Sequence, residues 1–75
     1  MSSLYAKMPA KNFRLNGQEH TSVADTLLTL LNELELTGKK TAVEVNGEII
    51  PRSRYAHTLI RTDDCIEIVR AIGGG

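Results

Sequence analysis

The sequence predicts an α+β fold in which one main helix packs on one face of a mixed sheet of four to five strands. Two Asn-Gly pairs, at 16–17 and 46–47, each separate short strand-like runs, and a leucine-rich stretch between them repeats at helical spacing. Residues 65–72 alternate like a strand but have no hairpin partner next to them in the sequence. If this last strand lies beside the first, it completes one sheet with the helix across it.

The first hairpin is predicted from residues 12–15 and 18–21. Asn16-Gly17 is a strong hairpin signal because a type I′ turn needs positive φ at both central residues. We interpret residues 1–10 as a flexible N-terminal extension and residues 11–72 as the single folded domain. Residues 1–18 are basic and contain no acid, so a short transit peptide is the alternative for this stretch.

The helix is predicted to begin near Ser22, because Ser22 and Asp25 fit the S-x-x-[DE] capping pattern. Gly38 suits the left-handed residue that follows a helix end. Apolar residues at helical spacing mark the side of the helix that faces the core: Val23, Leu27, Leu30, Leu31 and Leu34.

The second hairpin is predicted from residues 43–45 and 48–50. Pro51 has no N–H to donate and ends the second of these strands. Residues 52–58 then read as an irregular connection, with Tyr55 as an apolar plug against the core.

The rest of the chain leads into the last strand. Leu59-Ile60 reads as a short strand or a packed bend, and Asp63-Asp64 as a turn. The final strand is predicted over Cys65–Ile72. Alternation places Ile66 and Ile68 on one face of it and Glu67 and Val69 on the other.

The glycines 73–75 directly follow this strand. Glycine costs the most backbone entropy to order, so we expect residues 73–75 to form a mobile tail. The alpha-carboxylate of Gly75 is its one chemically usable group, and the folded part then serves to present it. Val69, Ala71 and Ile72 lie close to this tail, and an exposed apolar strip there would dock a partner. The alternative is that this strip packs under the connection or under the N-terminal strand.

Size, charge and cysteine content exclude several classes of function. The chain has 75 residues, and its nine basic and nine acidic side chains cancel, which argues against nucleic acid binding. It has no apolar run long enough for a membrane span, and its single cysteine cannot form an internal disulfide. We therefore expect a cytoplasmic protein with no membrane partner. A domain this small has little room for an active-site cavity, so a stand-alone enzyme is not expected.

The remaining cysteine, histidine, aspartate and arginine residues give no strong signal for a functional site. Cys65 lies between acids, which does not favour a reactive thiolate. His20 and His57 lack metal-ligand spacing, so no metal site is expected. Asp63-Asp64 is typical of a turn rather than of a magnesium site. Four arginines form either a basic rim for an acidic partner or a solvated face: Arg52, Arg54, Arg61 and Arg70.

Four segments resemble the small sulfur carriers of thiamin biosynthesis (ThiS type), which have the ubiquitin-like β-grasp fold. They are Val43 to Arg52, Tyr55, Asp64 to Val69, and Ile72 to Gly75. The most specific parts are the Asn-x-x-Ile-Ile-Pro-Arg segment from Asn46 to Arg52 and the Ile-Glu-Ile-Val strand. The third glycine departs from the glycine pair that many members have. The resemblance covers about residues 12–75.

The resemblance implies that the Gly75 carboxylate carries sulfur. An adenylating enzyme related to ubiquitin-activating enzymes uses ATP to activate it, and a persulfide derived from a cysteine desulfurase converts it to a thiocarboxylate. Thiazole synthase then takes the sulfur. Gly73, Gly74, Ile72, Val69 and Ala71 are the expected partner-binding residues. The chain is a co-substrate, with no stably bound cofactor.

Three alternatives remain at this point. The small subunit of molybdopterin synthase shares the glycine end and the same carrier chemistry, with a pterin as acceptor. A ubiquitin-like protein modifier would use the same tail to form amide bonds with lysines. In a plain interaction module the tail would have no role. The Asn46 to Arg52 segment favours the thiamin carrier.

Overall fold

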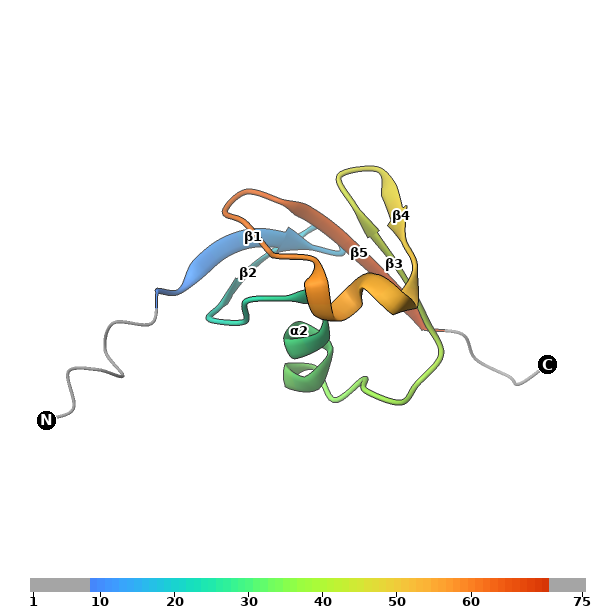
Figure 1. Ribbon diagram of the computed structural model, residues 1–75. Coiled ribbons are helices and arrows are strands. Elements are labelled where there is room, and N and C mark those ends of the chain that lie inside the picture. The colour runs from blue at the N-terminus through green and yellow to red at the C-terminus, as the bar shows by residue number, and fades with distance from the viewer. Residues whose placement is uncertain (1–8, 71–75) are drawn as a thin grey trace, which may run out of the picture.

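The computed structural model describes residues 9–70, which form a five-stranded mixed sheet with the main helix on one face (Figure 1). Strands β1 (Lys11–Leu15) and β2 (Gln18–Ser22) form the first hairpin, and β3 (Thr41–Val45) and β4 (Glu48–Ile50) form the second. Helix α2 (Leu27–Glu33) lies between the hairpins in sequence, and a 3-10 helix, η1 (Arg52–His57), leads toward β5 (Cys65–Arg70). The strand order is β2-β1-β5-β3-β4.

The last strand lies beside the first, as predicted. Strand β5 pairs in parallel with β1 and antiparallel with β3, so it occupies the centre of the sheet. A single element that is central to the sheet and last in the chain joins the two hairpins into one layer.

Both hairpin turns adopt the predicted left-handed conformation. The φ angles are 52° and 83° at Asn16 and Gly17, and 53° and 86° at Asn46 and Gly47. Positive φ at both central positions is what a type I′ turn requires, and asparagine and glycine tolerate it best.

The two turn asparagines also hold β5. Asn16 accepts a hydrogen bond from the Ile68 N–H (2.8 Å) and donates one to the Ile68 carbonyl (3.3 Å). On the other edge, Asn46 accepts from the Cys65 N–H (2.9 Å) and donates to Asp64 Oδ1 (3.0 Å). Each asparagine side chain therefore forms hydrogen bonds with the β5 segment next to the point where its own strand ends and turns away.

The start of the helix differs from the prediction. The N-cap is Thr26, in an extended conformation, and Thr26 and Thr29 exchange the two hydrogen bonds of a capping box. Ser22 instead ends β2, where its buried hydroxyl accepts from the Ala24 N–H and donates to Glu33. Because the helix starts after Val23, that side chain is 46% exposed rather than part of the core.

The end of the helix also differs. Helix α2 ends at Glu33, and the left-handed residue that follows it is Glu35 (φ 61°), not Gly38. Glu35 N–H donates to the Asn32 carbonyl and Leu36 N–H to the Leu31 carbonyl, which together form a Schellman motif. Gly38 does have a positive φ of 85°, but it lies in the later loop.

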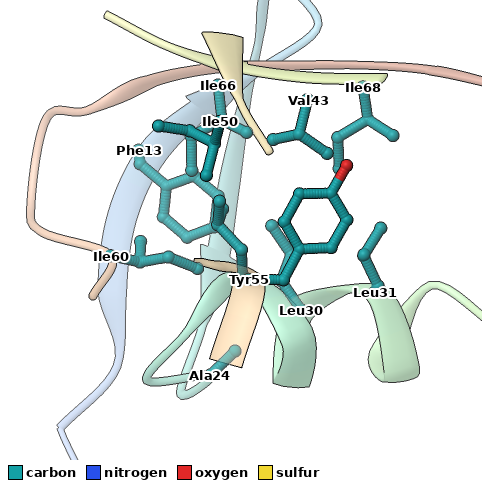
Figure 2. Close-up of a cluster of buried hydrophobic side chains, with 11 residues drawn as sticks. Phe13, Ala24, Leu30, Leu31, Val43, Ile50, Tyr55, Ile60, Ile66 and Ile68 are labelled. Carbon is teal, nitrogen blue, oxygen red and sulfur yellow. The ribbon is translucent and has the colours of Figure 1, made fainter. Parts of the chain in front are cut away.

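The core lies between the sheet and the layer made by α2 and η1 (Figure 2). Tyr55 projects from η1 into the middle of it, is only 4% exposed, and places its hydroxyl 3.4 Å from the Thr41 carbonyl. The plug was thus predicted correctly, whereas the irregular connection around it is a 3-10 helix. Leu59 forms an isolated bridge with Thr26, and Ile60 is buried. The largest fully buried side chains are Phe13, Leu27, Leu30, Ile66 and Val43.

Replacing Asn16 by glycine is expected to destabilise the fold by about 1–3 kcal/mol, as measured by urea unfolding. Glycine keeps the turn conformation but removes both hydrogen bonds to Ile68. Glu35→Gly is the matched control, because Glu35 also has a positive φ and its side chain is exposed. The control is expected to match or exceed wild-type stability. An equal loss in both variants would contradict a role for the Asn16 side chain.

The Ser22–Glu33 contact predicts a pH-dependent contribution to stability. The Ser22 hydrogen bond, helped by His20 at 3.0 Å, lowers the pKa of Glu33 below its ordinary value of 4.5. A lowered folded-state pKa stabilises the fold above the unfolded-state pKa, and this contribution disappears as pH falls through the folded-state pKa.

Glu33→Gln is therefore expected to lose roughly 0.5–1 kcal/mol at neutral pH, a modest value because the Glu33 side chain is 39% exposed. The difference from wild type should vanish in acid. Urea unfolding at several pH values measures it, with Glu48→Gln, on exposed β4, as the control. A difference that persists unchanged below the folded-state pKa would argue against the charged contact.

Candidate functional site

The glycine tail starts from a fixed point at one end of the sheet. Arg70 is the last residue of β5 and pairs with Thr41 at the beginning of β3. The predicted site residues Ala71, Ile72, Gly73, Gly74 and Gly75 lie outside the described residues. What the fold contributes to the site is therefore the end of β5 and the surface around it.

Strand β1 accompanies β5 only at its beginning. The parallel pairs are Arg14 with Cys65 and Leu15 with Ile66, after which β1 turns away and the Asn16 amide takes both backbone groups of Ile68. Strand β3 continues alongside as far as Arg70. The register of the strand that leads to the tail is therefore held by β3 and by one side chain.

Val69 is exposed on the sheet face opposite the helix, as the docking interpretation requires. It is 63% exposed, so Val69 itself does not pack under the connection or under the N-terminal strand, whereas Ala71 and Ile72 lie outside the described residues. Val69 lines a shallow groove of about 120 Å³ with Ala42, Ile49 and two glutamates. Ile49 is 74% exposed, which makes this the apolar part of the face.

Glu44 and Glu67 are the two glutamates of this groove. They face each other in the β3–β5 ladder, and Glu44 also faces Ile49 across the β3–β4 ladder. Like charges on directly facing strand positions destabilise a sheet. The only ion pairs within residues 9–70 are Lys11–Asp25 and His20–Glu33, so neither groove glutamate is neutralised there.

Glu44 and Ile49 were not predicted as site residues. The period-2 alternation of residues 43–45 and 48–50 does assign them to the outer face. Their proximity to Val69 could not be predicted, because it depends on the pairing of β5 with β3.

Cys65, Asp64 and Asp63, the other candidate residues near β5, belong to the strand itself or to the turn before it. Cys65 is exposed on β5, and its N–H is bonded to Asn46. Asp64 accepts from the Asn46 side chain and from the Arg61 N–H (2.8 Å), so it shapes the turn before β5 as predicted. Asp63 has a φ of 71° in the same turn.

The histidines do not meet. His20 lies in β2 beside Glu33 and against the Phe13 ring (5.4 Å between centroids), whereas His57 ends η1. In the part of the chain that the structure describes, His, Cys, Asp and Glu side chains form no group that could hold a metal ion. Within residues 9–70, α2 and η1 are too short to cross a membrane.

The four arginines of the expected basic rim do not form one patch. Arg52 and Arg54 belong to η1, Arg61 precedes the turn at 62–63, and Arg70 ends β5. All four are exposed. Arg52 donates to the Lys39 carbonyl at 3.4 Å, which directs it toward the loop after α2.

Comparison with known proteins gives consistent results. The model of the ThiS family matches residues 7–75. The chain is 39% identical over 64 residues to the sulfur carrier protein ThiS of Bacillus subtilis, covering 83% of this chain and 97% of that protein. The crystal structure of the thiamine biosynthesis protein ThiS from Geobacter metallireducens superposes with a TM-score of 0.71 at 29% identity. That match covers 85% of this chain and 99% of that one.

The chain is also similar to part of a larger protein. It is 45% identical over 62 residues to a thiazole synthase of Paramagnetospirillum magneticum, and the match covers 81% of this chain. This chain spans only 19% of the length of that protein, and likewise of a thiazole synthase from Magnetococcus marinus.

The ubiquitin-like β-grasp sheet and the family match over residues 7–75 both indicate the same family. The chain belongs to the ThiS family.

Proposed function

We propose that this protein is a sulfur carrier for the thiazole branch of thiamin biosynthesis, with the Gly75 carboxylate as the carrying group. The observation that carries the proposal is the family match, which runs through the glycine end. The similarity to the ThiS protein of Bacillus subtilis over 97% of its length supports it.

The chemistry follows from the state of a terminal carboxylate. Its pKa is about 3.3–3.7, so at neutral pH it is an anion and a poor electrophile. An adenylating enzyme uses ATP to form the acyl-adenylate, and the acyl carbon then accepts sulfur that originates from a cysteine desulfurase while AMP leaves. The resulting thiocarboxylate donates its sulfur to thiazole synthase.

In this scheme the chain is a cytoplasmic co-substrate and not an enzyme. Binding of ATP and stabilisation of the oxyanion are tasks of the partner enzymes. Gly73 and Gly74 have no Cβ, which lets the backbone enter a narrow channel in each partner. The folded domain contributes affinity and aims the tail.

We assign the groove around Val69 to the docking of the adenylating enzyme. The exposed Ile49 and Val69 side chains offer apolar area beside the origin of the tail, and the facing Glu44 and Glu67 favour a partner that brings a lysine or arginine. Such a cation would relieve the repulsion between the two carboxylates.

Membership in the ThiS family favours this role over the small subunit of molybdopterin synthase. A ubiquitin-like modifier is distinguished by its product, because it ends as an amide on a target lysine and not as a thiocarboxylate.

Deleting Gly75 is expected to abolish thiocarboxylate formation and to leave the fold intact. Intact mass spectrometry after incubation with ATP, the adenylating enzyme and a sulfur source measures the exchange of one oxygen for one sulfur. Wild type should show this mass gain. The same gain on the shortened chain would sink the assignment of Gly75.

Val69→Ser and Ile49→Ser are each expected to weaken binding of the adenylating enzyme by about tenfold, the loss from uncovering one buried aliphatic side chain. Calorimetry measures the affinities. Val23→Ser is the control, since Val23 is also partly exposed but lies outside the groove. Equal weakening by all three variants would indicate a general effect and remove the groove from the interface.

A further inference from the structure

A second apolar pocket lies on the helix side of the molecule, at the end from which the tail starts. The loop after α2, the 3-10 helix η1 and the end of β5 come together there (Figure 1). The pocket has a volume of about 220 Å³. Its apolar lining comes from Leu28, Leu31, Leu36 and Tyr55, and its rim carries Lys39 and Arg52.

The helix end builds the apolar part of this pocket. The Schellman motif reverses the chain direction and brings Leu36 back to Leu31. A hydrophobic contact between these two positions usually accompanies the motif. Leu28 lies off the core-facing stripe of α2 and is 36% exposed. The Tyr55 side chain is buried behind the pocket and closes it toward the core.

The rim of the pocket is positively charged. The Arg52 side chain reaches the Lys39 carbonyl, which holds the two cationic residues at the same opening. Arg70 pairs with Thr41, which also lines the pocket, and residues that pair directly project to the same face of a sheet. Neither of the two ion pairs within residues 9–70 involves Lys39, Arg52 or Arg70.

We propose that this pocket docks an acidic segment of thiazole synthase that inserts an apolar side chain between Leu28 and Leu36. This inference rests on the proposed function, because it names the partner that receives the tail. An apolar pocket with a cationic rim complements an aliphatic or aromatic anchor flanked by Asp or Glu.

Thiazole synthase is the occupant because two observations point to it. Thiazole synthases from two bacteria contain a segment similar to this domain within a larger polypeptide, so in those proteins a domain of this kind is joined covalently to the rest of the synthase. The pocket also adjoins the origin of the tail, since Thr41 and Arg70 lie in register and facing Cα atoms of an antiparallel pair are about 4.5–5.5 Å apart. A synthase that takes up the tail therefore has surface next to this pocket.

Charge separates the pocket from the groove around Val69. The groove carries two carboxylates and lies on the outer face of the sheet, whereas the pocket carries cations and lies on the helix side. A partner surface suited to one is repelled by the other.

The test measures the affinity of thiazole synthase for the full chain and four variants as a function of salt. Arg52→Glu and Lys39→Glu are expected to weaken binding about tenfold at low salt and to flatten the salt dependence. Leu28→Ala should weaken binding severalfold with the salt dependence unchanged. Arg54→Glu is the matched control, because Arg54 lies on the same 3-10 helix but does not line the pocket. Thermal unfolding verifies that each variant is folded.

Several outcomes would overturn the proposal. Affinity that stays at the wild-type value in Arg52→Glu and Lys39→Glu removes the pocket from the synthase interface, and so does weakening of the adenylating enzyme alone. Altered NMR signals of residues 71–75 in free Arg52→Glu, with unchanged synthase affinity, would assign the pocket to the protein's own tail. Loss of a concentration-dependent dimer in sedimentation, again with unchanged affinity, would assign it to a second copy.

The sulfur-loading measurement separates this inference from the proposed function. If the wild-type protein gains sulfur and the pocket variants still bind thiazole synthase with wild-type affinity, only the docking site is refuted. Wild type that binds synthase through the pocket but gains no sulfur refutes the carrier role alone. Wild type that neither binds synthase nor gains sulfur refutes both.

Discussion

The fold depends on how strand β5 is held at the centre of the sheet. It is the last strand in sequence, and neither of its neighbours is connected to it by a hairpin. Its two edges are held by strands β1 and β3 and, beyond the ends of those strands, by the amides of Asn16 and Asn46. The residue that makes each turn possible thus also binds the central strand. A substitution at either asparagine removes its bonds to β5, and a residue that disfavours positive φ also disturbs the local turn.

This arrangement determines what the domain can offer a partner. Strand β3 pairs with β5 up to Arg70, so the end of the described strand has a defined position in the sheet. The two exposed apolar surfaces adjoin that position from opposite faces of the sheet, through Val69 on one face and through Thr41 on the other. A domain in which the register of β5 could slip would present different surfaces in each molecule, because a slip of one residue exchanges the two faces of the strand.

Much of this fold could be predicted from local sequence signals. The two Asn-Gly turns, the alternation of β5 and the leucine stripe are properties of neighbouring residues, and all three were confirmed. The helix limits were predicted less well, because Ser22 and Thr26 both offer a capping hydroxyl and only the packing of β2 against Glu33 decides between them. Gly38 was predicted to follow the helix because glycine favours positive φ. The residue that follows it with positive φ is Glu35, and glutamate gives no sequence signal for that conformation. The groove and the pocket could not be predicted, since each joins residues from strands or helices far apart in sequence.

The two oppositely charged surfaces fit the proposed role of a carrier that is passed between partners. In the role proposed above, a bare glycine tail would offer every partner the same few atoms, so it would give little discrimination between the enzyme that loads sulfur and the one that removes it. Discrimination must then come from the folded domain. An acid-flanked groove and a cation-rimmed pocket on different faces allow each partner to be recognised by its own charge pattern. Rim charges act mainly on the rate of association, so such recognition selects the partner at encounter without making either complex too stable to release the carrier.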